Sequence, residues 1–132
     1  MKVMIDTNII ISALLSPHGQ TAKAFYKALQ LPFVPLTCQY IVDEVQRKFT
    51  KKLASHAYKL HDFDEILPLF QFVPTPVKSV ASETLIRDVK DLPILRAALL
   101  ADADFILTGD KDFFEAAIER SQIIGVNDFL EL

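Results

Sequence analysis

Four acidic residues occupy positions where a carboxylate could take part in chemistry rather than only face solvent. They are Asp6, Glu44, Asp91 and Asp110. Several carboxylates in one crevice repel one another, and some must take up protons unless a cation lies between them. Ligand sets made only of oxygen favour Mg²⁺ or Mn²⁺ over Zn²⁺. If these acids converge, they predict a metal site suited to phosphoryl chemistry, because such ions orient and acidify water.

Asp6 stands directly between two apolar runs, Val3–Ile5 and Ile9–Ile11. A carboxylate in such a setting is costly to desolvate unless it is paired, hydrogen-bonded or bound to a metal. Asn8, two residues on, is a second polar group that could orient a metal-bound carboxylate or its water. The alternative interpretation is that Asp6 only caps a helix that begins at Thr7 or Asn8.

Two of the other acids have ordinary structural explanations when each is considered alone. Glu44 lies near the start of an expected helix, where a negative charge favours the helix dipole, and Asp43 beside it is interpreted as solvated. Asp91 is a good N-cap for the helical pattern that follows, and Asp88 is a loop acid with similar claims.

The acids are more informative as a set. Asp110 and Asp112 lie in a turn, where Asp is common, and Asp112 could cap the next helix. Asp6 and Asp110 nevertheless both follow apolar strands, and Asp91 opens the helix that leads to the second of those strands. The set therefore favours an acidic metal crevice.

A stretch without acids begins immediately after Glu44 and runs from Val45 to Leu60. Its cations are Arg47, Lys48, Lys51, Lys52 and Lys59. If helical, the stretch places a basic surface beside the acidic site, where cations hold backbone phosphates. The alternative is a solvated helix face with lysines extended into water. The net charge of −3 gives the whole chain no general attraction to nucleic acid, so such a local surface or metal ions would be needed.

Short apolar strands alternate with helical patterns, which predicts a parallel sheet with helices on both faces. We expect strands at 1–5, 32–36, 72–73, 104–108 and 123–126, and helices over 22–29, 41–53 and 63–67, from 91 onward, over 113–118 and over 127–130. We expect Thr21 and Asn127 as helix caps and a loop over 82–90. Ligands of such sheets bind at the carboxyl ends of strands, where the strand order reverses. Asp6 and Asp110 share that crevice if their strands are neighbours.

Length and composition fit a single cytosolic domain covering residues 1–132, with 51% apolar and 23% charged residues. The longest uncharged apolar stretch, Ile9–Pro17, is far too short to span a bilayer. Cys38 is the only cysteine and is expected to be a small core residue. Three scattered glycines exclude a glycine-rich phosphate loop. The histidines, His18, His56 and His61, form no zinc-ligand pattern and are expected to face solvent.

These residues together resemble those of the PIN-domain nucleases. The resemblance rests on Asp6-Thr7-Asn8, on Glu44, on Asp91 with Ile94 and Ala97 after it, and on the segment Thr108-Gly109-Asp110-Lys111-Asp112-Phe113. It covers essentially the whole chain. Within the family, the sequence is most similar to the VapC-type toxins of toxin–antitoxin systems.

The resemblance implies a three-layer α/β/α fold with a central parallel sheet. It implies that one or two Mg²⁺ or Mn²⁺ ions are bound by Asp6, Glu44, Asp91 and Asp110. Asn8 and Thr108 would support the site through hydrogen bonds, and Asp112 would be a further ligand or a helix cap. By the same resemblance the activity is RNA cleavage by metal-activated water, leaving a 5′-phosphate and a 3′-hydroxyl. It further implies inhibition by a small antitoxin protein and a homodimer.

Two other classes of function stay open at the level of the sequence. One is a catalytically weak module that binds RNA or protein and keeps the acidic pocket. The other is a metal-dependent phosphatase or a structure-specific DNA nuclease. The phosphatase is disfavoured because Asn8 stands where a second Asp would be expected, and no appended helical module supports the DNA nuclease.

Overall fold

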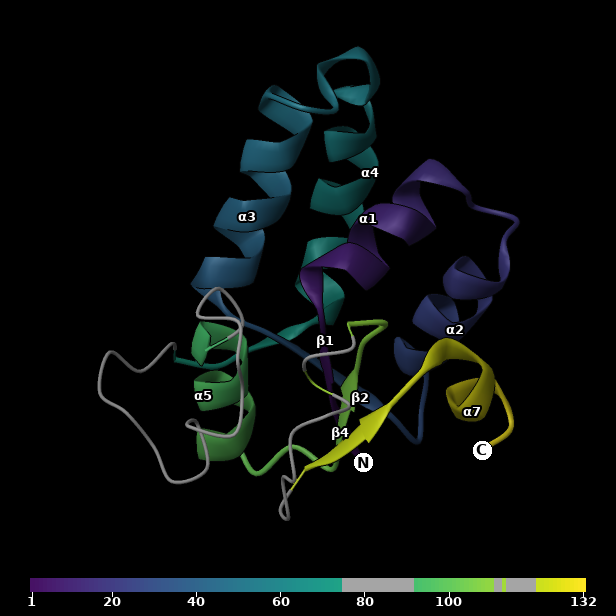
Figure 1. The fold of residues 1–132 in the computed structure, drawn as a ribbon, viewed down its shortest axis with the longest axis vertical. Coiled ribbons are helices and arrows are strands. Elements are labelled where there is room, and N and C mark those ends of the chain that lie inside the picture. Colours follow the sequence, from purple (N-terminus) through teal and green to yellow (C-terminus); the bar gives the residue numbers. More distant parts are fainter. Residues whose placement is uncertain (75–91, 111–112, 114–120) are drawn as a thin grey trace.

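The computed structural model describes residues 1–74, 92–110, 113 and 121–132 of the chain (Figure 1). In chain order the elements are β1 (Lys2–Ile5), α1 (Thr7–Leu15), α2 (Gln20–Ala28), β2 (Val34–Thr37), α3 (Gln39–Thr50), η1 (Ala54–His56), α4 (Lys59–Ile66), η2 (Leu67–Leu69), β3 (Gln71–Phe72), α5 (Leu92–Leu100), β4 (Phe105–Leu107), β5 (Gln122–Ile124) and α7 (Val126–Leu130). Strands and helices alternate as the hydrophobic pattern predicts.

The described strands form a five-stranded sheet in the order β3-β2-β1-β4-β5. Every pairing in this sheet is parallel. From β1 the chain moves outward through β2 and β3, and then returns to the other side of β1 to form β4 and β5. The strand order therefore reverses between β1 and β4. These two strands pair with Ile5 opposite Leu107, so the residues that follow them lie at the same edge of the sheet.

Helices cover both faces of the sheet, which confirms the predicted three-layer α/β/α architecture. Figure 1 shows α2 and α7 on one side of the sheet and α5 on the other. Helices α3 and α4 pack against each other and rise beyond the carboxyl end of β1 (Figure 1). This arrangement puts α3 above the edge where β1 and β4 end.

The central strand explains why the first apolar run carries no alternation of polar and apolar residues. Val3, Met4 and Ile5 are all fully buried, because β1 has a strand on each edge and helices over each face. Burying an apolar side chain of this size contributes about 1.5–3 kcal/mol. Cys38 is also buried, as expected for a core residue, and the three histidines are exposed, as predicted.

Three expectations about helix ends are wrong. Helix α2 begins after Gly19, whose carbonyl accepts from the Lys23 amide at 3.2 Å, so Thr21 lies inside the first turn rather than at the cap. Gly125, not Asn127, is the N-cap of α7. Helix α3 ends at Thr50, and Leu53 is held in the turn that follows, its amide donating to the carbonyl of Lys48 at 2.9 Å. The apolar stripe continues through that turn, which is why it predicted a longer helix.

Several sequence predictions lie outside the described residues. They concern Asp91 as a helix cap and ligand, Asp112, the loop over 82–90 and most of the helix over 113–118. Phe113 itself is described and is buried. Among the described residues, no helix is long and apolar enough to cross a membrane.

Candidate metal centre

Asp6 lies at the point where the strand order reverses. The strand β1 ends at Ile5, and the Asp6 amide still donates to the Leu107 carbonyl of β4 at 3.0 Å. Asp6 occupies the N-cap position of α1 with an extended backbone, but its side chain makes no capping hydrogen bond. The capping interpretation therefore accounts for the position of Asp6 and leaves its buried carboxylate, 3% exposed, to be explained.

Thr108 fixes the Asp6 carboxylate and connects it to Asp110. The hydroxyl of Thr108 donates to Asp6 Oδ2 at 2.8 Å and accepts from the Asp110 amide at 3.0 Å. Thr108 is fully buried, and its own amide donates to the Ile124 carbonyl of β5 at 3.1 Å. The hydroxyl of Thr108 thus bridges the residues at the ends of β1 and β4.

Glu44 approaches the same edge from α3. Its side chain is 12% exposed, and Oε2 accepts from the Tyr40 hydroxyl at 3.4 Å and lies 3.7 Å from Arg47 Nη2. Asp43 is exposed and accepts from Gln39 Nε2 at 2.8 Å. Of the two neighbouring acids, Glu44 is therefore the one that faces the interior, in agreement with the sequence interpretation.

The electrostatics of Asp6 bring three of the predicted ligands into one neighbourhood. The pKa of Asp6 is raised from 3.8 to about 6, chiefly by burial and additionally by the negative charges of Asp110 and Glu44. The hydrogen bonds from Thr108 and from the Thr7 backbone oppose the rise in the pKa but do not cancel it. A carboxylate held among like charges is stabilised in its ionised form by a cation, so the local chemistry fits a divalent ion.

The donor set fits Mg²⁺ or Mn²⁺ because it consists of carboxylate oxygens. Within the described ranges, no three Asp, Glu, His or Cys side chains are close enough, as they stand, to hold an ion together. Asp91 and Asp112, two further predicted members of the site, lie outside those ranges. The fit therefore rests on the buried Asp6 carboxylate and its acidic surroundings.

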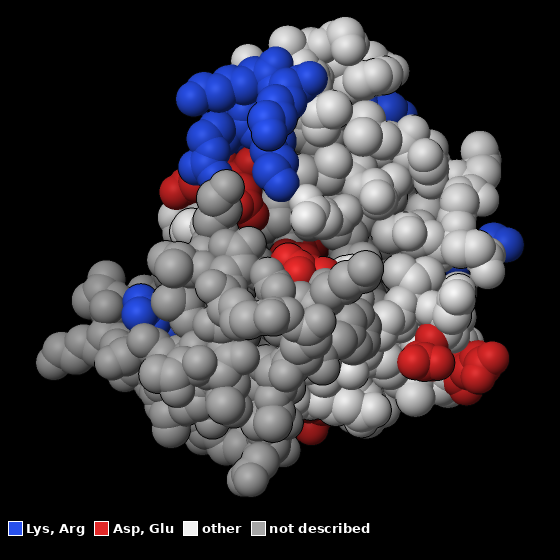
Figure 2. Space-filling model, in the orientation of Figure 1, with Lys and Arg blue, Asp and Glu red and all other residues white. Residues whose placement is uncertain are grey.

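Asn8 links this centre to a surface of α3. Its side chain is exposed, and Oδ1 accepts from Lys48 Nζ at 3.0 Å. Four basic residues at the end of α3 and directly after it line a hollow of about 170 Å³. We call them the basic surface: Arg47, Lys48, Lys51 and Lys52. Figure 2 shows the Lys and Arg side chains gathered over α3, with acidic side chains directly beside them. The predicted juxtaposition of a basic surface and an acidic centre is present.

A polar cavity of about 280 Å³ adjoins the acids on another side. It is lined by Asn8, Ile9, Ser12, Thr21, Gly109, Asp110 and Val126. Sequence reasoning missed Ser12 altogether and interpreted Thr21 as a helix cap. The available signal was that Asn8 and Ser12 are four residues apart, which places them on one face of α1.

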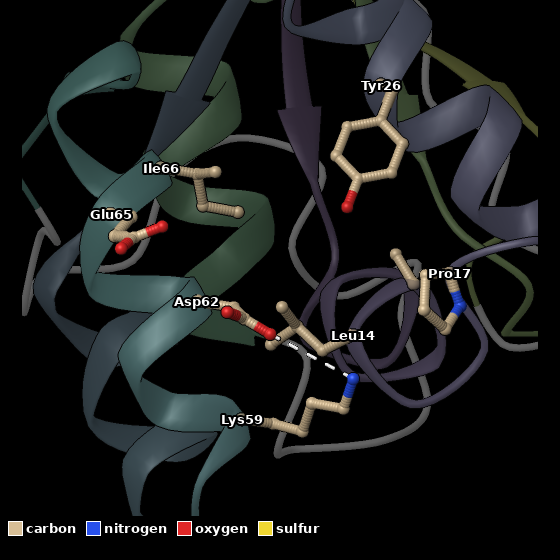
Figure 3. Close-up of a pocket in the computed structure, with 8 residues that line it drawn as sticks. Leu14, Pro17, Tyr26, Lys59, Asp62, Glu65 and Ile66 are labelled. Atoms are coloured by element: carbon tan, nitrogen blue, oxygen red, sulfur yellow. Dashed lines mark ion pairs between the residues drawn. The ribbon is translucent and has the colours of Figure 1, made fainter.

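A second cavity, of about 180 Å³, lies away from the acids between α1, α2 and α4. Figure 3 shows Tyr26, Leu14 and Ile66 on its walls and the ion pair of Lys59 with Asp62, both from α4, at 3.9 Å. Glu65, also in its wall, pairs with His61 at 3.0 Å. Its charged groups are engaged with each other, which makes this cavity a poorer candidate for catalysis than the edge at Asp6.

The fold and the acidic edge define a class of protein. A model of the PIN domain matches residues 2–112, and the chain therefore belongs to the PIN domain family. PIN domains are generally nucleases. The chain is also 29% identical over 124 residues to an uncharacterised protein of Methanocaldococcus jannaschii, covering 93% of this chain and 79% of that protein.

Solved structures show the same fold. The VapBC2 complex of Rickettsia felis, bound to a DNA fragment from its promoter, matches with a TM-score of 0.70 and 17% identity, covering 95% of this chain and 98% of the other. The DNA-bound VapBC complex of Salmonella typhimurium matches with a TM-score of 0.70 and 14% identity, covering 96% and 98%. The expected PIN architecture is confirmed.

Proposed function

We propose that this chain is a metal-dependent endoribonuclease that acts in the cytoplasm as the toxin of a toxin–antitoxin pair. The observation that carries the proposal is the buried Asp6 carboxylate at the reversal of strand order, held by Thr108 at 2.8 Å among the charges of Asp110 and Glu44. Membership of the PIN domain family supports nuclease chemistry at this edge. The likeness to VapC-containing structures supports the fold in which a toxin of this kind would be built.

The residues proposed to hold one or two Mg²⁺ or Mn²⁺ ions are Asp6, Glu44, Asp91 and Asp110. The ions would supply a Lewis acid that acidifies water and stabilises negative charge on a phosphate. Thr108 keeps the Asp6 carboxylate in one orientation through its 2.8 Å hydrogen bond. Asp112 is proposed as a further ligand or as a helix cap, and Asn8 as the residue that joins the centre to the basic surface through Lys48.

The basic surface is proposed to hold the RNA backbone. Its cations lie at the end of α3, the helix that carries Glu44, and directly after it, so phosphates bound there would direct the strand across the acids. Arg47 lies 3.7 Å from Glu44, and Lys48 contacts Asn8, which couples substrate-holding groups directly to the centre. Cleavage is expected to leave a 5′-phosphate and a 3′-hydroxyl.

Two protein partners are proposed by analogy. The similar structures are VapBC assemblies bound to DNA, and the corresponding partner of this chain would be a small antitoxin protein. A homodimer is proposed on the same analogy, and large exposed apolar side chains such as Leu69, Phe72 and Leu100 are compatible with it. Light scattering of the purified chain tests the dimer, and co-purification with the product of an adjacent small gene tests the antitoxin.

The activity is tested by incubating purified protein with a mixed pool of RNA and with DNA of matched sequence. RNA cleavage should occur with Mg²⁺ or Mn²⁺, should stop in EDTA and should return when the metal is restored. Sequencing of the ends should find 5′-phosphates. RNA that stays intact under every metal condition would contradict the proposal, as would cleavage that persists in EDTA.

One observation favours a second candidate, a catalytically weak module that binds RNA or protein. In the part of the chain that the structure describes, three acids are not gathered closely enough to hold an ion as they stand. This candidate predicts RNA or protein binding that survives Asp110→Asn, without metal-dependent cleavage. The same RNA assay, paired with a binding measurement on Asp110→Asn, separates the two candidates.

A further inference from the structure

We propose that the polar cavity binds the nucleoside beside the scissile phosphate, and that the hydroxyls of Ser12 and Thr21 select ribose over deoxyribose there. The proposal rests on the proposed function, since it names the part of the substrate that this edge of the sheet recognises. The acidic centre alone does not imply such a subsite. The location, the lining and the volume of the cavity are the observations that support it.

The cavity is contiguous with the acidic centre. Asp110 lines the cavity, and its amide donates to the same Thr108 hydroxyl that holds Asp6. Asn8 also lines the cavity, and its Oδ1 accepts from Lys48 of the basic surface. A strand whose backbone follows the basic surface and crosses the acids would therefore place its next nucleoside at the cavity.

The lining suits a neutral, hydrogen-bonding group rather than a phosphate. Ser12 and Thr21 present hydroxyls from α1 and α2, Asn8 presents an amide, and Ile9 and Val126 supply apolar surface. The lining residues that the structure describes include no cation, whereas the neighbouring basic surface is made of four. Hydroxyls both donate and accept, which matches the 2′-hydroxyl that distinguishes RNA from DNA. A site built to bond a hydroxyl rejects the analogue that lacks it.

The volume of the cavity suits a single nucleoside. Its volume of about 280 Å³ lies just below the range of about 300–1,000 Å³ that is typical of drug-sized ligands. One nucleoside fits such a space, and a longer segment of nucleic acid does not. The cavity is therefore placed and sized to read the nucleotide at one side of the cleaved bond.

Gly109 offers a way to close the cavity without disturbing the fold. Among the described residues, no heavy atom lies within 4 Å of a Cβ atom built at Gly109, and the φ of Gly109 is not positive. A larger side chain can therefore be attached at this position without a clash, and it would lie next to the cavity that Gly109 lines. Gly109→Leu is a blocking variant that leaves both hydroxyls in place.

The direct test is to titrate the four ribonucleoside 5′-monophosphates and their 2′-deoxy counterparts into the full chain in EDTA. Binding is measured by NMR. Mononucleotides contain no phosphodiester to cleave, so the measurement is independent of catalysis. At least one ribonucleotide should bind and shift the Ser12 and Thr21 signals. Its deoxy counterpart should bind about 5- to 10-fold more weakly, the loss expected for one hydrogen bond.

Three variants sharpen the test. The double variant Ser12→Ala, Thr21→Val should weaken the ribonucleotide to the level of the deoxynucleotide, and Gly109→Leu should abolish binding of both. Ser12 is exposed and Thr21 partly so, so the fold should tolerate their replacement, which thermal melting checks. Ser55→Ala, an exposed hydroxyl of η1, is the matched control and should bind as the parent does.

Equal affinity for ribose and deoxyribose would overturn the proposal, as would no binding at millimolar nucleotide or shifts confined to the basic surface. Failure of the proposed function appears separately, in the RNA cleavage assay. If RNA is cleaved with metal and the double variant keeps the same rate and the same preference for RNA over DNA, the subsite is wrong and the nuclease stands. If selective ribonucleotide binding is found and RNA stays intact, the subsite stands and the nuclease is wrong.

Discussion

Asp6 is held in a setting that opposes its ionisation. It is buried at a strand end among Asp110 and Glu44, and its pKa is raised from 3.8 to about 6. Ionisation of most carboxylates stabilises the folded state, whereas ionisation of Asp6 destabilises it. A carboxylate kept in such a place is explained by a bound cation better than by a role in stabilising the chain.

The raised pKa of Asp6 predicts how stability depends on pH in EDTA. Because the folded chain holds this proton more tightly than the unfolded chain, protonation stabilises the fold fully below pH 3.8, and this contribution is lost as the pH rises through about 6. A shift of this size corresponds to about 3 kcal/mol. Asp6→Asn should therefore unfold at a higher temperature than wild type at pH 7.5 and at a similar temperature near pH 4.

Adding Mn²⁺ at pH 7.5 should raise the unfolding temperature of wild type and not that of Asp6→Asn, since only a ligand that binds the folded state stabilises it. Asp43→Asn, which removes an exposed carboxylate next to Glu44, is the control and should respond to Mn²⁺ as wild type does. If wild type and Asp6→Asn showed the same pH dependence in EDTA, the burial of an ionisable Asp6 would be refuted.

Thr108 is the second residue whose replacement is informative. Thr108→Val keeps the shape of the side chain but removes the hydrogen bonds to Asp6 Oδ2 and from the Asp110 amide. Loss of such a supporting group typically costs about 10–100-fold in metal affinity or activity. Calorimetric Mn²⁺ titration should show that weakening in Thr108→Val, while Thr108→Ser stays close to wild type. Unchanged affinity in Thr108→Val would mean that the hydroxyl does not serve the metal centre.

Helix α3 combines the acidic and basic parts of the proposed mechanism. Glu44 faces the sheet edge, while the end of the helix and the residues after it present Lys48, Lys51 and Lys52. Arg47 pairs with Glu44 at 3.7 Å, whereas Lys51 and Lys52 follow the end of the helix at Thr50. Figure 2 shows the basic side chains gathered beside acidic ones. The end of the helix can therefore hold a phosphate backbone beside a cation bound at Glu44.

The basic surface predicts a change in the salt dependence of RNA binding. Binding of single strands weakens with salt with a slope of about 0.7 for each phosphate neutralised, so Lys51→Ala, Lys52→Ala should lower the slope by about 1.4. The charge-preserving Lys51→Arg, Lys52→Arg should restore it. Fluorescence anisotropy in EDTA measures this without cleavage. An unaltered slope in the alanine variant would favour the interpretation of these lysines as a solvated face.

Lys27 of α2 holds the end of α7 and Leu132 through its ammonium group. Its Nζ donates to the carbonyls of Phe129, Leu130 and Leu132 at 2.9, 3.1 and 2.9 Å. Lys27→Met should lower the free energy of unfolding by about 1–3 kcal/mol in urea, because charged hydrogen bonds are lost. Lys23→Met, on an exposed face of the same helix, should have little effect. Altered RNA cleavage with unaltered stability would contradict a purely structural role for Lys27.

At the scale of the whole molecule, the sequence predicted the layers better than the details. The apolar runs and helical stripes were sufficient for the strands, most helices and the three-layer architecture, because burial on both faces leaves a clear pattern. The pairing of β1 with β4 could not be predicted from the sequence alone, because it joins residues about one hundred positions apart. The helix caps at Gly19 and Gly125 were missed because glycine has no side chain that could cap a helix, and neither end carries a side-chain capping hydrogen bond.

The acidic residues of the candidate site could be predicted from the sequence better than the contacts that the site residues make. The acids were recognisable because carboxylates beside buried strands need an explanation. Asn8 was expected to support the site through hydrogen bonds, and the bond that the structure shows comes from Lys48, forty residues away. Ser12 and the part played by Thr21 were not recognisable, because two helices bring them to one cavity and no local pattern joins them.

The carboxylates around Asp6 are proposed to drive metal-dependent cleavage of RNA. The most direct measurement is the Mn²⁺-dependent cleavage rate of one RNA by wild type, Asp6→Asn and Asp43→Asn, each prepared identically and checked by circular dichroism. We predict that Asp6→Asn is folded and loses at least about 100-fold in rate, the upper end of the loss seen when a residue that supports a metal ligand is replaced, while Asp43→Asn cleaves as wild type does. A folded Asp6→Asn that cleaves RNA at the wild-type rate would contradict a role of Asp6 in catalysis.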